Sequence, residues 1–447
     1  IKPLACSPAE VASLLEALRR ALPSALLFLR NVHTVQAYVR RSPAEEPQLL
    51  WRASSRAAVG MGAADVSPEI TALPDEAPAR LQAPIISFIA GTHGAGAAPA
   101  AGGPGQAAAV TSSGAGSSDL AGFFKRLQAA QQPAQAQAQQ PGLLLQAAGR
   151  VQLLTQDCAP PASGDEAAGA SISGRGGGLE EWVVCNGLAG GAARDIAVKA
   201  WSQSHTKMVP WVGVAARLGG RGGRGTVSKS GKAATDISGL SVPGQAFCFL
   251  PLPIPTGLPV HVNGFFELSS NRRDIWHGGD MSGAGARRAR WNQALLTDGA
   301  APAYLALLLQ VAQASGPGPT LYDLFPTLDL PEPWALLSRA LYGHAGAAPL
   351  AWTPGAPATA AGTTSASAPA QSGGGHWLPL AQAVLPDATC GAGAAVEALL
   401  LAAGLPLAAH IPAAVQEALL QATPGVRRLS PALARAHLSR VLQALSL

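Results

Sequence analysis

Charged and aromatic residues are both scarce in this sequence. Of its 447 residues, 13% are Asp, Glu, Lys or Arg, and 5% are Phe, Trp or Tyr. The formal net charge is +5, which is small for the length and gives no general reason to expect a nucleic-acid partner. Glycine (51 residues) and proline (37 residues) are abundant instead, so a large share of the chain contributes little to a core.

Cysteine is sparse too, and its spacing argues against two classes of site. The five cysteines lie far apart with no CxxC pair, at Cys6, Cys158, Cys185, Cys248 and Cys390. This spacing favours reduced thiols in a cytoplasmic protein over a disulfide framework or a zinc site. The sequence also lacks an HExxH motif and any run of about 18 apolar residues, so neither a metal site nor a membrane partner is expected.

Catalytic motifs are missing as well. No G-x-S-x-G elbow occurs, which removes support for a hydrolase of that type. The segment Thr226–Ala233 (TVSKSGKA) is a near match to a phosphate loop, but it lacks the first glycine and the hydroxyl after the lysine. We expect this chain to be no enzyme by itself and to hold no cofactor, nucleotide or metal of its own.

Four segments are rich in Gly, Ala, Ser or Pro and poor in large apolar residues. We expect them to be disordered insertions, because they bury too little to offset the entropy of ordering. One contains the sequence RGGRG at Arg221–Gly225, which resembles RNA-binding RGG segments, although a single copy is more typical of a flexible loop. The four segments are 91–118, 159–178, 217–236 and 353–375.

Several ordered elements are predicted between the insertions. Ser7 and Pro8 begin a helix, and a second helix starts near Asp119 with Phe123, Phe124 and Leu127 on one face. A third helix covers 192–204, and strands are predicted at 84–90, 151–154, 182–185 and 209–215. A helix that starts at Trp291 is expected to break near Gly299. The apolar face of the first helix is expected to consist of Val11, Leu14, Leu15, Leu18 and Leu22.

The most informative run is Ala246–Trp276. It opens with a short apolar strand, Phe247–Leu250, and continues with four prolines that exclude a helix or a central strand. Strict alternation from 260 to 268 then predicts a half-buried strand. A polar turn follows, with Arg272 and Arg273 at its exit.

The run FLPLPIPTGLPVHVNGFFELSSNRRDIW, together with Trp291-Asn292 and Ala301–Tyr304, resembles the repeated supra-domain of the sacsin family. The stretches LLFLRNVHTVQAYV, EWVVCNGL and MVPWVGVAARL agree with the order of that family. Its repeats begin with an ATPase fold like that of the ninety-kilodalton heat-shock chaperones.

The resemblance implies an α+β fold in three parts. Residues 1–56 would be the end of an ATPase-type α/β sandwich, 57–313 a middle α/β sandwich domain with the first three insertions, and 314–447 a mainly helical part with the fourth. Because the chain begins at Ile1 and lacks the DxGxG turn of such ATPases, ATP and magnesium are expected only in a module upstream.

The same resemblance implies chaperone or co-chaperone work on client proteins, with other chaperones as partners. Two alternatives stay open: an RNA-binding protein that uses the RGG segment, and a non-catalytic scaffold that binds partners through its helical part. A middle-domain arginine completes the ATPase site in heat-shock chaperones, and Arg272 or Arg273 is the candidate for that role. An ion pair with Asp274 or Glu267 is the commoner role for such arginines.

Overall fold

The computed structural model divides the chain into two compact units. The first comprises 1–133 and 142–303, and the second comprises 134–141 and 304–447. Residues described are 8–29, 32–40, 46–57, 88, 118–130, 143–158, 177–221, 243–279, 282–355, 374–387 and 394–445.

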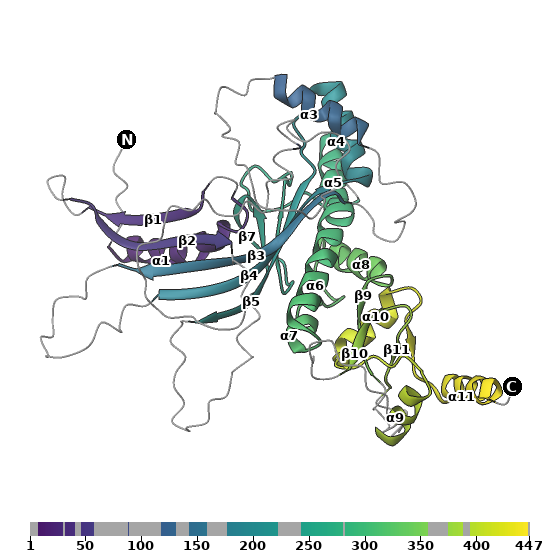
Figure 1. Cartoon of the computed structure of the whole chain (residues 1–447). Helices are drawn as coiled ribbons and strands as arrows, with labels where there is room; N and C mark the ends of the chain where they lie inside the picture. Colours follow the sequence, from purple (N-terminus) through teal and green to yellow (C-terminus); the bar gives the residue numbers. More distant parts are fainter. Residues whose placement is uncertain are drawn as a thin grey trace, which may run out of the picture. The chain divides into compact units, whose positions relative to one another are not determined.

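The first unit is built around an eight-stranded sheet (Figure 1). Its strand order is β1-β2-β3-β4-β5-β8-β6-β7, and neighbours are antiparallel except for β6 and β8. The mixture of this sheet with helices confirms the predicted α+β class. The strands are β1 (Thr34–Val39), β2 (Gln48–Ala57), β3 (Leu143–Asp157), β4 (Gly177–Ala189), β5 (Trp211–Arg221), β6 (Gln245–Cys248), β7 (Leu250–Pro255) and β8 (His261–Gly264).

Two of the predicted helices pack on each other as expected. In α3 (Ser118–Ala129), Phe123, Phe124 and Leu127 are buried. The ring of Phe124 stacks on Trp201 of α4 (Gly191–Ser204) at 4.5 Å between centroids. Arg194 of α4 donates from Nε to the Leu127 carbonyl at 2.8 Å, which satisfies one of the free carbonyls at the end of α3.

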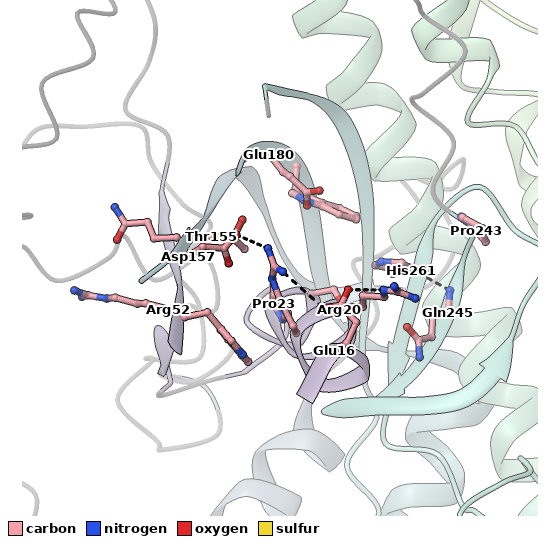
Figure 2. Close-up of a pocket in the computed structure, with 15 residues that line it drawn as sticks. Glu16, Arg20, Pro23, Arg52, Thr155, Asp157, Glu180, Pro243, Gln245 and His261 are labelled. Atoms are coloured by element: carbon pink, nitrogen blue, oxygen red, sulfur yellow. Dashed lines mark hydrogen bonds and ion pairs between the residues drawn. The ribbon is translucent and has the colours of Figure 1, made fainter. Parts of the chain in front are cut away.

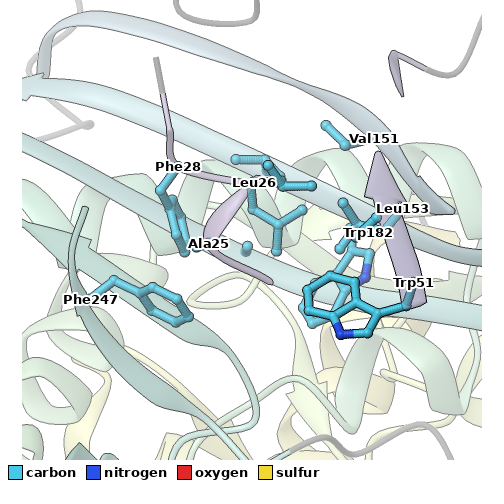
Figure 3. Close-up of a cluster of buried hydrophobic side chains, with 12 residues drawn as sticks. Ala25, Leu26, Phe28, Trp51, Val151, Leu153, Trp182 and Phe247 are labelled. Carbon is cyan, nitrogen blue, oxygen red and sulfur yellow. The ribbon is translucent and has the colours of Figure 1, made fainter. Parts of the chain in front are cut away.

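The end of α1 (Pro8–Ala25) covers one face of the sheet. Figure 3 shows the resulting core, where side chains of the turn after α1 meet those of β2, β3, β4 and β6. Phe28 and Phe247 are fully buried, with ring centroids 5.0 Å apart. The twelve buried residues of this cluster are Ala25, Leu26, Leu27, Phe28, Trp51, Ala53, Val151, Leu153, Trp182, Val184, Ala215 and Phe247.

The apolar face predicted for the first helix is not buried along its length. Val11, Leu14 and Leu18 are 43%, 59% and 38% exposed. Only the C-terminal end of α1 contributes residues to the core, and Leu22 packs against it. Helical periodicity therefore identified the helix correctly but not which of its turns meet the sheet.

The proline-rich connection forms the edge strand β7. Three of its six residues are proline, at Pro251, Pro253 and Pro255, and an edge strand tolerates the missing amide donors. The next strand differs from its prediction. β8 covers only His261–Gly264, and all of its residues are buried rather than half-buried, because it lies between β5 and β6 inside the sheet.

Predicted insertion bounds also need correction where strands extend into them. Residues 177–178 belong to β4 and 217–221 to β5, since backbone pairing such as Leu179 with Arg221 does not require apolar side chains. Residues 353–354 and 375 likewise lie in strands. The rest of the four insertions lies outside the described residues except 118, which begins α3, and 355 and 374. Of the predicted strand 84–90 only Phe88 is described, and it is helical rather than extended.

The sheet also runs across the boundary expected at 56/57, because β2 pairs with β3 from Trp51 to Ala57. The assignment of 1–56 to an ATPase-type module stays a prediction.

No break occurs near Gly299. Instead, α5 (Gly283–Leu295) continues through one π-helical turn, η2 (Leu296–Ala300), into α6. A Cβ on Gly299 would lie 2.8 Å from Cγ1 of Val212, so only glycine allows this close approach to the sheet. Asp298 in the same turn accepts a hydrogen bond from the backbone amide of Ala192 at 2.7 Å and so stabilises the start of α4.

The second unit is mainly helical, with two small two-stranded sheets. Buried tyrosine hydroxyls tie its loops together: Tyr304 donates to the Leu324 carbonyl at 2.5 Å and Tyr342 to the Pro326 carbonyl at 2.7 Å. Its elements are α6 (Ala301–Ser315), α7 (Pro319–Tyr322), α8 (Trp334–Ala345), β9 (Pro349–Pro354), β10 (Gly375–Pro379), β11 (Val384–Leu385), α9 (Ala394–Ala402), α10 (Ala413–Ala422), β12 (Arg427–Arg428) and α11 (Pro431–Leu445).

Candidate functional site

The two candidate arginines lie in a hairpin that follows β8, residues 265–276, here called the arginine hairpin. Its two sides meet at an antiparallel bridge between Leu268 and Ile275. The Trp276 amide donates to the Glu267 carbonyl at 3.3 Å, and the Trp276 indole donates to the Leu268 carbonyl at 3.0 Å. These contacts close the base of the hairpin.

Polar side chains hold the tip of the hairpin. The Ser269 hydroxyl accepts the Asp274 amide at 3.0 Å, and the Asn271 side-chain oxygen accepts the Arg273 amide at 3.0 Å. Arg272 has a φ of 57°, in the left-handed region, and its amide donates to the Ser269 carbonyl at 2.9 Å. A non-glycine residue in this region is strained, so the surrounding hydrogen bonds must impose the conformation. These hydrogen bonds hold the backbone at the two arginines.

Helix α5 anchors the hairpin through two buried side chains. Asn292, which is 1% exposed, donates from Nδ2 to the carbonyls of Glu267 (2.8 Å) and Trp276 (2.9 Å). Its Oδ1 accepts the Glu267 amide at 2.8 Å. The indole of Trp291 donates to the Phe265 carbonyl at 2.8 Å. Asn292 thus bridges both sides of the hairpin base, and its amide can do so because it carries donors and an acceptor together.

Both arginine side chains are exposed, and neither forms the ion pair that is common for such residues. Glu267 pairs instead with Arg288 of α5 at 3.4 Å, and the Arg288 guanidinium lies 5.5 Å from the centroid of the Trp276 ring. Within the described ranges, no carboxylate lies within ion-pair distance of Arg272 or Arg273. Their guanidinium groups remain available for a ligand.

The thiol of Cys248 is close enough to Arg272 to feel its charge, and it does not add nucleophilic chemistry. Burial raises the pKa of its thiol above the ordinary value, and the positive charge of Arg272 opposes this only in part. At neutral pH the group is therefore a protonated thiol. The arrangement suits binding of an anion by two planar forks, since guanidinium matches phosphate and carboxylate geometry.

The phosphate-loop look-alike Thr226–Ala233 and the glycines after Arg221 lie outside the described residues. Among the residues that the structure does describe, no group of three His, Cys, Asp or Glu is placed to hold a metal ion. Sequence reasoning gave no role to Asn292 or Arg288, although Trp291-Asn292 carried part of the resemblance. Their roles depend on contacts across the fold.

One helical run, Gly283–Ser315, is long and apolar enough to cross a membrane by length and composition alone. Of its most apolar window, 78% is buried inside the protein, as in a core helix.

Comparison with known proteins gives one informative match. The chain is 47% identical to human sacsin over 95 residues, which are 21% of this chain and 2% of sacsin. No family model matches the chain, and no solved structure matches it. The chain therefore contains a sacsin-like region, and the match covers a small part of that relative.

Proposed function

We propose that this sacsin-like region is part of a molecular chaperone or co-chaperone that acts on client proteins in the cytoplasm. ATP would be bound and hydrolysed by an ATPase-type module upstream, with magnesium, and not by this chain. The arginine hairpin would contribute Arg272 or Arg273 to the phosphates held by that module. The likeness to human sacsin supports the choice of protein class.

One observation carries the proposal: the backbone of the arginine hairpin is ordered, while the side chains of its two arginines are exposed and without an ion pair in the described part of the chain. Exposed arginines on surfaces are usually mobile, and holding one costs side-chain and backbone entropy. Here the backbone is fixed by Ser269, Asn271 and Asn292, while both guanidinium groups lack an ion pair within the described part of the chain. A group that is positioned in advance loses less freedom when it meets a charged ligand.

The first experiment tests whether this chain binds ATP itself or only contributes to an ATP site in the upstream module. Calorimetric titration of the isolated chain with ATP and magnesium is expected to give no binding at micromolar concentrations. A longer chain that includes the upstream module is expected to bind and hydrolyse ATP. Micromolar binding by the isolated chain would contradict the proposed division of roles.

The second experiment tests the arginines in that longer chain. Arg272→Ala or Arg273→Ala is expected to lower turnover at least ~10³-fold, as loss of an arginine finger does. The melting temperature should stay unchanged because both side chains are exposed. Arg290→Ala, an exposed arginine of α5, is the matched control. A smaller loss, or a loss accompanied by lower stability, would assign these residues a structural role.

A further inference from the structure

A pocket of about 450 Å³ lies between α1 and the sheet of the first unit (Figure 2). Side chains from α1, β2, β3, β4, β6 and β8 line it. It is separate from the arginine hairpin, whose residues do not line it. Its volume is in the range of small-molecule sites.

The charged groups around the pocket balance one another. Arg19 pairs with Asp157 at 2.5 Å and with Glu16 at 3.6 Å, while Arg20 pairs with Glu16 at 3.0 Å. The lining contains three arginines and three carboxylates, namely Arg19, Arg20, Arg52, Glu16, Asp157 and Glu180. The lining carries no net charge, and a charged ligand would compete with the ion pairs of Arg19 and Arg20. Arg52 has no ion pair within the described ranges, and Glu180 pairs with Arg217 outside the lining at 3.5 Å.

The inner wall is aromatic and carries a free donor on His261, in addition to Nε1 of Trp51 and Nε of Arg52, which are buried without a partner in the described part of the chain. His261 is 4% exposed, and its ring stacks on Trp182 with centroids 5.0 Å apart. The Gln245 amide donates to Nδ1 of His261 at 3.2 Å, which leaves the proton of the neutral ring on Nε2. Burial lowers the pKa of His261 to about 4, so the ring is neutral at pH 7. Nε2–H has no hydrogen-bond partner among the described residues.

Gln245, whose backbone amide donates to His261, also carries a free acceptor. The Gln245 side chain donates from Nε2 to the Leu252 carbonyl at 2.8 Å. Its Oε1 has no partner within the described part of the chain, and Gln245 lines the pocket. Figure 2 shows His261 and Gln245 joined at the pocket wall. A donor and an acceptor therefore come from two bonded neighbours, in a pocket whose lining also includes Trp51.

We propose that this pocket binds a small, uncharged ligand that carries a planar carboxamide. The carboxamide oxygen would accept the Nε2–H of His261, and its N–H would donate to Oε1 of Gln245. Its apolar body would lie against Trp51, which is 6% exposed and lines the pocket. Such a ligand satisfies two polar groups that otherwise rely on water, and it leaves the ion pairs at the rim intact.

Three probes of similar shape and different charge test the proposal on the full chain. Benzamide, benzoate and benzamidine are titrated separately, while ¹H–¹⁵N NMR of histidine-labelled protein follows the ring nitrogens of His261. Benzamide is expected to bind in the millimolar range, at least ten times more tightly than either charged probe, and to shift Nε2. Equal affinity for the three probes, or no shift at His261, would overturn the proposal.

His261→Phe removes the donor but keeps an aromatic ring against Trp182, and it is expected to weaken benzamide binding at least tenfold. His376→Phe, at an exposed histidine in β10, is the control and should leave binding unchanged. Unchanged benzamide affinity in folded His261→Phe would also contradict the proposal. If His261→Phe does not fold, the Nε2 shift in the unmodified protein still decides the question.

Discussion

Two pairs of arginines in the first unit are held in opposite ways. Arg19 and Arg20 of α1 both lie in ion pairs with carboxylates of Glu16 or Asp157. Arg272 and Arg273 lie on a hairpin whose backbone is fixed, yet no ion pair occupies them within the described ranges. The α1 arginines are therefore paired within the unit, whereas the hairpin arginines are free to meet a partner as proposed above.

Among these substitutions, replacement of Asn292, which anchors the arginine hairpin, should lower stability the most. Asn292→Ala leaves the Glu267 amide and the Trp276 carbonyl without partners at a site that is 1% exposed, and the Glu267 carbonyl keeps only the Trp276 amide. We expect a loss of about 3 kcal/mol in the free energy of unfolding, measured by denaturant titration. Asn271→Ala, which removes an exposed amide from the tip, should cost about 1 kcal/mol or less. Similar losses at both positions would contradict an anchoring role for Asn292.

The next prediction concerns the pH dependence of stability that the buried, neutral His261 should cause. Burial lowers the pKa of His261 to about 4 in the folded protein, whereas the unfolded chain binds the proton near pH 6.5. The unfolded state therefore gains protons first, and stability is lost as pH falls from 6.5 toward 4. We expect His261 to account for about 2 kcal/mol of that loss by pH 4.5.

The measurement is the free energy of unfolding at pH 7 and pH 4.5, compared between the unmodified protein and His261→Phe. The variant should lose less stability than the unmodified protein over this interval, because its ring does not titrate. Identical pH dependence in both proteins would show that His261 is not held neutral by burial.

Breaking an ion pair of α1 should matter less. Arg19 and Asp157 side chains are 45% and 33% exposed, so solvent screens their attraction. Arg19→Ala is expected to cost at most about 1 kcal/mol of unfolding free energy, and the cost should shrink in 1 M salt. A cost of several kcal/mol, independent of salt, would mean that the helix depends on this pair to stay on the sheet.

The smallest predicted change in the free energy of unfolding is a gain rather than a loss. Glycine at position 272 would relieve the left-handed strain that a φ of 57° imposes on arginine. We expect Arg272→Gly to leave stability unchanged or raise it by up to about 1 kcal/mol in the same denaturant titration. A clear destabilisation would mean that the side chain contributes to folding and is not reserved for a ligand.

Local patterns predicted the elements better than their burial. The α3 face of Phe123, Phe124 and Leu127 follows from periodicity. Proline chemistry correctly excluded a central strand at 250–255 but did not predict the edge strand β7 that forms there. The exposure of Leu14 and the full burial of β8 could not be predicted in this way, because both depend on which elements pack nearby.

The same limit applies to the candidate site. The arginines could be picked out from their place after a predicted strand and a polar turn. The Arg288–Glu267 pair and the Asn292 anchor join residues 16 to 25 positions apart, so only the tertiary structure identifies them. The pocket wall of His261, Gln245 and Trp51 is likewise assembled from three different strands.

The most direct test of the central claim is turnover of the longer chain with lysine at both hairpin positions. Arg272→Lys with Arg273→Lys keeps both charges but removes the planar forks that match a phosphate group. ATP turnover is expected to fall about 100-fold or more, with unchanged melting temperature and normal turnover in the Arg290→Lys control. Near-normal turnover in the double variant would contradict the claim that the hairpin arginines act on phosphate.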